Sequence, residues 1–224
     1  MGIGENIARV RERIARAAAR SGRDAGGVEL VAVSKFKPVS DIMDAYRAGQ
    51  LVFGENHAQE LRDKIPQLPA DIRWHYIGML QTNKLKYLVG KTTLIQSVDS
   101  ARQLEQMEKL SAAAGVTAEF LVQVSPVGEP QKGGISPDRA EAFLREAGAL
   151  PHVKARGLMM VPPLENDPET NRPLFRELYR LYEALRPAYP AFAHLSMGMS
   201  ADFEIAVEEG ANMVRVGTDI FGAR

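Results

Sequence analysis

Short runs rich in β-branched residues alternate with stretches of helical periodicity along the chain, and this alternation most constrains the fold. Eight runs have the length and composition of strands: 28–34, 51–54, 72–78, 93–98, 118–124, 153–161, 192–196 and 212–216. Seven helical stretches follow the first seven of them: 39–48, 57–68, 83–89, 101–114, 136–147, 170–185 and 201–209. Such alternation predicts parallel strands with right-handed crossovers, and eight units in about 200 residues favour a closed barrel.

The N-terminal segment predicts the helix that is missing after the eighth strand. Its apolar residues fall at helical spacing: Ile3, Ile7, Val10, Ile14 and Ala17. The segment is also Arg-rich, as a transit peptide would be, but Glu5 and Glu12 interrupt the basic run and favour a helix lying on the barrel. The expected fold class is α/β, a single (β/α)8 TIM-type barrel with an extra N-terminal helix, and residues 1–224 are expected to form one domain.

Charge and composition exclude several kinds of protein. Lys plus Arg equals Asp plus Glu at 28 each, so the formal net charge is zero, which argues against binding to nucleic acid or to an anionic membrane. The N-terminus holds no apolar run long enough for a signal peptide or a membrane span. The absence of cysteine excludes disulfides, thiolate metal sites and Cys nucleophiles and fits a cytoplasmic protein, and we expect no metal site.

Two small-residue turns stand where barrels of this kind bind phosphate, which is after strands seven and eight. The segment 196–200 (SMGMS) follows the seventh expected strand, and Gly217, Thr218 and Asp219 follow the eighth. Both supply hydroxyls and backbone N–H groups, and a helix expected to begin near Ala201 adds its positive N-terminal end. Most Gly/Ser turns are ordinary turns, but two at the two expected positions favour a phosphate site.

Three polar residues stand within an expected strand or at its end. Lys35 follows directly after VELVAVS, Asn56 ends FGEN, and Arg215 lies within VRVG. Each has a structural alternative: for Lys35 a side chain that extends to the rim, for Asn56 a bond to its own turn, and for Arg215 an ion pair with a strand-end acid. With the two small-residue turns, these residues make one set: an amine that can condense with an aldehyde, a phosphate cradle, and a cation between them.

Seven sequence strings carry a resemblance to a known family. They are LVAVSK (30–35), FGEN with the following Gln59-Glu60, WHYIGMLQTNK (74–84), SVDS (97–100), GLMMVPP (157–163), LSMGMSADFEIA (195–206) and VRVGTDIFG (214–222). In this order, over nearly the whole chain, they resemble the pyridoxal phosphate homeostasis proteins. The resemblance implies the barrel of alanine racemase, a fold-type III barrel that binds pyridoxal 5′-phosphate (PLP).

The resemblance also implies roles for individual residues. Lys35 matches the lysine that forms a Schiff base with PLP, and Arg215 matches the arginine facing the pyridine nitrogen. Ser200, Gly217 and Thr218 match phosphate-binding positions, and Asn56 matches a strand-two residue near the cofactor. His75, Met79 and Ser196 match the wall of the pocket. One stretch departs from the family pattern, because QVSPVGEPQKGG (123–134) keeps Glu129, Lys132 and Gly134 but places prolines before them, which puts a transfer role for Lys132 in doubt.

An arginine opposite the pyridine nitrogen makes the ring a weak electron sink. Racemases with this arrangement add a second base from another domain, whereas the barrel uses up this chain and Tyr76 is expected to point away from the side that His75 faces. We therefore expect a non-catalytic carrier in intracellular PLP (vitamin B6) homeostasis, a monomer or weak dimer, with apo PLP enzymes as candidate recipients. The alternative is a fold-type III PLP-dependent enzyme such as an amino-acid racemase.

Overall fold

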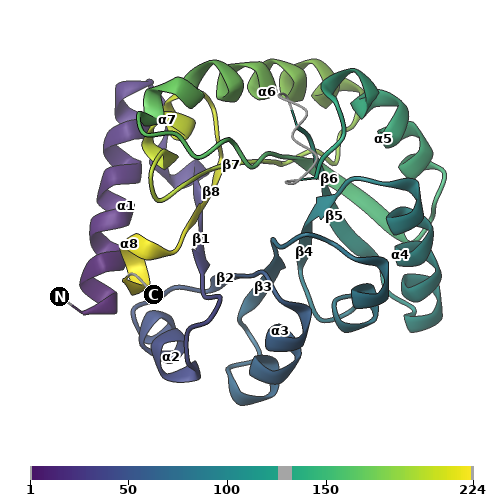
Figure 1. Cartoon of the computed structure of the whole chain (residues 1–224), viewed down its shortest axis with the longest axis horizontal. Helices are drawn as coiled ribbons and strands as arrows, with labels where there is room; N and C mark the ends of the chain where they lie inside the picture. The colour runs from purple at the N-terminus through teal and green to yellow at the C-terminus, as the bar shows by residue number, and fades with distance from the viewer. Residues whose placement is uncertain (1, 126–132, 223–224) are drawn as a thin grey trace.

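Eight parallel strands close into a barrel in the computed structural model, which describes residues 2–125 and 133–222 (Figure 1). The strands follow one another in chain order and β1 pairs with β8, so the expected (β/α)8 barrel is confirmed. Their bounds are β1 Glu29–Val33, β2 Val52–Glu55, β3 Arg73–Tyr76, β4 Leu94–Val98, β5 Ala118–Gln123, β6 Val153–Met159, β7 His194–Met199 and β8 Met213–Val216.

Helices surround the barrel (Figure 1). Within the described residues they are α1 Ile3–Arg20, α2 Val39–Arg47, α3 Ala58–Lys64, α4 Ala101–Ala114, α5 Ala140–Gly148, α6 Arg172–Leu185, α7 Phe203–Glu208 and α8 Thr218–Phe221. Short 3₁₀ turns lie at Ala25–Gly27, Ile65–Gln67, Thr82–Tyr87, Pro137–Arg139, Pro168–Asn171 and Arg186–Ala188. The α1 helix buries the predicted stripe and packs between α7 and α2, so it occupies the eighth helical position as expected.

The seventh strand differs most from its expected bounds. It runs from His194 to Met199, so most of the segment expected to form the loop continues the strand. Gly198 has a φ of +91°, and a Cβ added there would lie 2.6 Å from Ala206 Cβ. The register with β8 shifts between Ser196 and Met199. The glycine therefore marks an irregularity inside the strand that lets α7 pack closely, and α7 begins at Phe203 rather than near Ala201.

Three smaller expectations also need correction. The stretch 83–89 is a 3₁₀ turn at Thr82–Tyr87 rather than a short α-helix, and one helical turn that the sequence did not reveal, α8, follows the last strand. Ser136 stands at an N-cap position, but its side chain makes no capping hydrogen bond. The helix of that unit starts as a 3₁₀ turn at Pro137–Arg139, with proline in the first turn, where its missing N–H costs no hydrogen bond.

The core has two layers. A small group of strand side chains fills the barrel interior: Val31, Val52, Leu94, Leu121, Met159 and Met213. A much larger apolar layer, including Phe53, Phe120 and Phe203, packs between the strands and the helices. The inner layer is capped toward the C-terminal ends of the strands by polar side chains, among them His75, Ser196 and Arg215, which are all buried. The mouth of the barrel, at the C-terminal ends of its strands, is therefore polar, and it lies above an apolar interior.

Candidate functional site

Lys35 stands directly beyond β1, at the C-terminal end of the barrel. Ser34, before it, is buried, and Lys35 itself is half-buried. It lines a pocket of about 440 Å³ together with Asn56 and Met79, so three residues singled out from the sequence meet there. Further lining residues that sequence reasoning missed include Phe36, Tyr76, Gly78 and Lys84. The pocket draws on the segments around the ends of β1, β2 and β3, so the parallel pairing of these three neighbouring strands brings the residues together.

Asn56 brings an unpaired polar atom to this pocket. Its Oδ1 is buried without a hydrogen-bond partner, so the side chain does not bond its own turn through that atom. The backbone of Gly78 packs against it so closely that an added Cβ would lie 2.1 Å from Asn56 O. A buried amide oxygen without a partner is unfavourable unless a ligand or water donates to it.

The two turns expected to bind phosphate meet in space. The backbone N–H of Gly217 donates to Ser200 Oγ at 3.3 Å, and Thr218 follows as the first residue of α8. Gly217 also packs on β1, where an added Cβ would lie 3.3 Å from Val33 O. The ends of β7, β8 and β1 are neighbours in the barrel, so this cradle of small residues lies beside the strand that carries Lys35.

Lys37 ties the same two regions together from the other side. Its ammonium donates to Phe221 O at 3.0 Å and to Gly222 O at 3.3 Å, at the C-terminal end of α8. A cation is favourable at the C-terminal end of a helical turn, where carbonyl oxygens have no helical partner. The turn after β1 and the turn after β8 are therefore held to one another.

Arg215 is a buried cation without a carboxylate partner in the described part of the chain. Its Nη1 donates to Ser196 Oγ at 2.6 Å and its Nη2 donates to Met160 O at 2.7 Å. Burial lowers the pKa of the guanidinium to about 10, and the charge of Asp202 opposes this without an ion-pair contact. The structural ion pair that was the alternative explanation for Arg215 is thus not formed, and its charge is left for a bound group.

A chain of hydrogen bonds supports Arg215 from inside the barrel. Ser196 Oγ donates to Gln96 Oε1 at 2.6 Å, and Gln96 Nε2 lies 2.9 Å from His75 Nδ1. Burial lowers the pKa of His75 to about 3, with further lowering from the charges of His194 and Arg73. The ring is therefore neutral and accepts from Gln96 through Nδ1. His75 and Ser196 support the site from below, and the described pocket lining does not include them.

Gln96 is the residue of this hydrogen-bond network that sequence reasoning missed. It is fully buried in β4, and its amide also contacts Met213 Sδ at 3.2 Å. The available signal was a glutamine inside the apolar run TTLIQSV, which needs a polar partner once it is buried. Tyr76, which the sequence places on the opposite side from His75, lines the pocket; its hydroxyl donates to Met79 O at 3.0 Å, and burial raises its pKa to about 12. Glu129 and Lys132, also considered from the sequence, lie outside the described residues.

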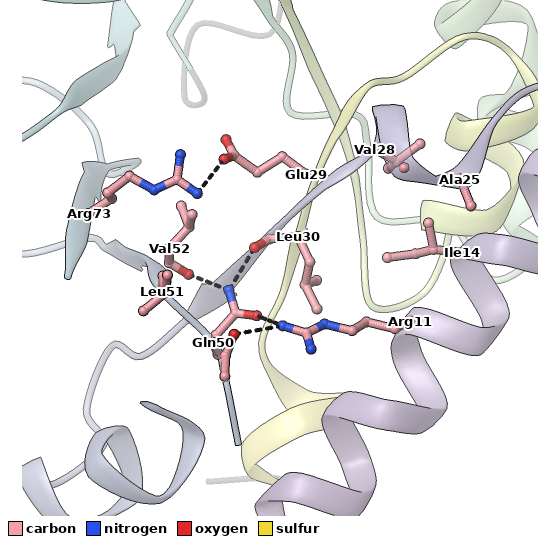
Figure 2. A pocket seen from close by; sticks show the side chains of 12 residues that line it. Arg11, Ile14, Ala25, Val28, Glu29, Leu30, Gln50, Leu51, Val52 and Arg73 are labelled. Carbon is pink, nitrogen blue, oxygen red and sulfur yellow. Dashed lines mark hydrogen bonds and ion pairs between the residues drawn. The ribbon is translucent and has the colours of Figure 1, made fainter. Parts of the chain in front are cut away.

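A second pocket, of about 410 Å³, lies at the N-terminal end of the barrel between α1 and the starts of β1 and β2 (Figure 2). Gln50 lies at its centre and donates to Leu30 O and Val52 O, each at 2.7 Å. Arg11 donates to Gln50 Oε1 at 3.2 Å, and Arg73 pairs with Glu29 at 3.1 Å. Every charged or amide side chain lining this pocket therefore has a partner within the protein, whereas Asn56 Oδ1 at the mouth has none.

The fold and the mouth define a class of barrel that the comparisons identify. Residues 6–224 match the family model for the alanine racemase N-terminal domain. The pyridoxal phosphate homeostasis protein of Aquifex aeolicus is 43% identical over 98% of this chain and 97% of its own length. The chain therefore belongs to the family of pyridoxal phosphate homeostasis proteins.

Two solved structures extend the comparison. A protein from Bifidobacterium adolescentis described as unknown has a TM-score of 0.93, with 33% identity, and the match covers 98% of this chain and 94% of that one. PipY of Synechococcus elongatus, solved with PLP bound, has a TM-score of 0.83 and 35% identity, and the match covers 98% of this chain and all of the PipY chain.

Among the described residues, no helix is long and apolar enough to cross a membrane.

Proposed function

We propose that this protein binds PLP at the C-terminal mouth of its barrel and serves intracellular PLP homeostasis. The observation that carries the proposal is the convergence of Lys35, the cradle at Ser200 and Gly217, and the buried Arg215 at the ends of three adjacent strands. PLP offers an aldehyde, a phosphate and a pyridine ring, and these three groups match an amine, a phosphate cradle and a cation. The relatives' names and PipY with bound PLP support the same ligand.

The residues present fit the cofactor. Lys35 would hold it reversibly as a Schiff base, while Ser200, Gly217 and Thr218 would bind its phosphate through a hydroxyl and backbone N–H groups. Arg215 would face the ring nitrogen, and its missing carboxylate partner is the feature that calls for such a ligand. The remaining proposed contacts are the Asn56 amide, with its unpaired Oδ1, and Met79 in the pocket lining. His75 and Ser196, which the sequence suggests as pocket wall, would instead act from below through Arg215.

We propose further that the protein carries PLP rather than running a catalytic cycle. His75 and Tyr76, two buried side chains of this part of the barrel, are poor proton carriers near neutral pH, because burial keeps His75 neutral with a pKa of about 3 and raises the pKa of Tyr76 to about 12. Apo PLP enzymes are the proposed recipients. We propose that residues 1–224 act as one domain, monomeric or weakly dimeric, in the cytoplasm.

Visible absorbance and chemical trapping test the binding proposal. Purified protein mixed with PLP should gain a visible band, and borohydride should then fix one pyridoxyl group on Lys35, as located by peptide mass spectrometry. Lys35→Ala should abolish the fixed group. Lys84→Ala, which removes the other lysine lining the pocket, should retain it. If Lys84→Ala lost the adduct and Lys35→Ala retained it, the attachment would be at Lys84 and the proposed role of Lys35 would be wrong.

Isotope exchange separates the carrier from a racemase. Holo-protein incubated with single L-amino acids in heavy water should leave their α-hydrogens unexchanged over many hours. Incorporation of α-deuterium at enzyme-like rates, on the order of one per second, would overturn the carrier proposal in favour of catalysis.

A further inference from the structure

The residue after Lys35 has an unfavourable backbone conformation. Phe36 has a φ of +63°, and within the described residues it is the one position other than glycine with a positive φ. The left-handed region is disfavoured for a bulky residue because its Cβ crowds the backbone. Phe36 is also 54% exposed, so burial of its ring does not explain why the conformation persists. Something else must hold the turn in this form.

Two charged side chains of α3 hold the backbone on either side of Lys35. The Lys64 ammonium donates to Ser34 O at 2.9 Å, and the backbone N–H of Phe36 donates to Glu60 Oε1 at 2.7 Å. Lys64 and Glu60 are also bonded to each other at 2.6 Å, four residues apart on the helix. The peptide groups before and after the lysine are thus fixed by one ion pair.

Glu55 completes this cluster from β2. Its Oε1 accepts from the Lys64 ammonium at 2.7 Å and from Ser34 Oγ at 2.7 Å. The Glu55 side chain is fully buried and that of Lys64 is 8% exposed, so the cluster places charges where apolar side chains could pack. Buried ion pairs are often no more stabilising than well-packed apolar residues. What this cluster supplies, and apolar packing could not, is a set of hydrogen bonds to the turn at Lys35.

We propose that Glu60 and Lys64 are positioning residues for Lys35, which hold the turn after β1 in the left-handed form that presents the lysine to the pocket. This inference rests on the proposed PLP binding. Neither side chain is assigned contact with PLP. They act through the backbone of Ser34 and Phe36, and their effect is to reduce the conformational freedom that Lys35 loses when it is bonded to its ligand.

Substitution of Glu60 tests the clamp with little risk to folding, because the side chain is at the edge of the cluster and 20% exposed. Glu60→Ala should raise the dissociation constant for PLP about tenfold, as expected for loss of a charge-assisted hydrogen bond that preorganises the site. Glu60→Gln keeps an oxygen that can accept from Phe36 N–H and should restore most of the affinity. Glu141→Ala is the matched control, because it removes an exposed pair of the same spacing, with Arg145 on α5.

Amide hydrogen exchange on the PLP-free protein provides a readout that needs no cofactor. Glu60→Ala should speed exchange at Phe36, whose N–H loses its acceptor, while exchange in the barrel strands stays as in the Glu141→Ala control. Phe36→Gly should relieve the strain without destabilising the protein and yet weaken PLP binding, because glycine lets the turn relax. Because Phe36 also lines the pocket, Phe36→Ala is the control for loss of the ring, and a merely structural role for the cluster predicts the same PLP affinity in Phe36→Gly and Phe36→Ala.

The outcomes separate the two proposals. Wild-type protein that takes up no PLP would overturn the proposed function, and with it the role of the clamp. Wild-type protein that binds PLP, together with a Glu60→Ala variant that binds within twofold of it, would overturn the clamp alone. Weakened binding in Glu60→Ala, rescue in Glu60→Gln and no change in Glu141→Ala would support both.

Discussion

The two ends of the barrel carry pockets of similar size, but they differ in whether their polar groups have partners within the protein. At the N-terminal end, Gln50 bonds two strand carbonyls and Arg11, and Arg73 pairs with Glu29 (Figure 2). At the C-terminal mouth, Asn56 Oδ1 has no partner and Arg215 has no carboxylate. The two pockets differ little in volume, and what separates them is that Asn56 Oδ1 lines the mouth without a hydrogen-bond partner.

The difference indicates that the N-terminal end stabilises the fold and the C-terminal end binds a ligand. Paired groups at the N-terminal end join α1 to the first two strands and stabilise the fold. Unpaired and strained groups at the mouth cost stability in the absence of a ligand, and they are retained where a ligand can satisfy them. Substitutions at the two ends should therefore change different measured quantities, and the following predictions run from the largest effect to the smallest.

Gln50→Ala should lower the free energy of unfolding by about 3 kcal/mol, because two buried carbonyl oxygens, Leu30 O and Val52 O, lose their donor. PLP affinity should be unchanged. Urea denaturation and visible titration measure the two quantities. Gln67→Ala is the control, since that amide also bonds a backbone carbonyl, Asp63 O, but in solvent, and it should cost less than about 0.5 kcal/mol. Equal losses in the two variants would remove the proposed stabilising role of this end.

Acid should destabilise the protein through His75. The native ring stays neutral with a pKa of about 3, whereas the unfolded chain takes up a proton near the ordinary value of 6.5. The free energy of unfolding therefore falls as the pH drops below about 6.5, by about 2 kcal/mol from pH 7.5 to 5.0 for this residue, and continues to fall toward pH 3.

Urea titrations at several pH values check this dependence. In His75→Asn the slope with pH should be reduced but not removed. His194, at the start of β7, contributes a smaller dependence of the same sign, because burial and the charge of Arg156 lower its pKa too. An unaltered slope in His75→Asn would show that the ring is not the buried neutral group described above.

Arg215→Met should weaken PLP binding about tenfold or more, a loss of at least about 1.4 kcal/mol, because the cation proposed to face the ring is gone. The free energy of unfolding of the PLP-free protein should change by less than about 1 kcal/mol. Relief of an uncompensated buried charge offsets the two hydrogen bonds lost to Ser196 and Met160. A large loss of stability with intact PLP affinity would reclassify Arg215 as structural.

Arg73→Met is the matched change at the other end of the barrel and should have the smallest effect. Its partner Glu29 lies 3.1 Å away, but the Arg73 side chain is 53% exposed, so the ion pair is screened by solvent. We expect a change below about 0.5 kcal/mol in unfolding and none in PLP affinity. An effect on PLP equal to that of Arg215→Met would mean that the two ends are not independent.

The barrel could be predicted from the sequence because each strand and helix has its own periodicity, and alternation then leaves few topologies. The sequence pattern and the structure differ most at β7, where Gly198 is expected in a turn but lies inside the strand. A glycine marks both a turn and a close approach between elements, and only the position of α7 distinguishes the two. The α8 helix was missed because a single turn of four residues has no periodicity to detect.

Single residues of the candidate site were also visible in the sequence, because Lys35 and Asn56 are polar residues just beyond strand ends and Arg215 is a charged residue within a strand. By itself, the sequence determined the fold class, the family and these departures from pattern. Only the tertiary structure decided that Arg215 has no acid partner, that Gln96 links Ser196 to His75, and that α3 holds the turn at Lys35. The reason is physical: whether a polar group is paired depends on residues far away in the chain, which local patterns do not encode.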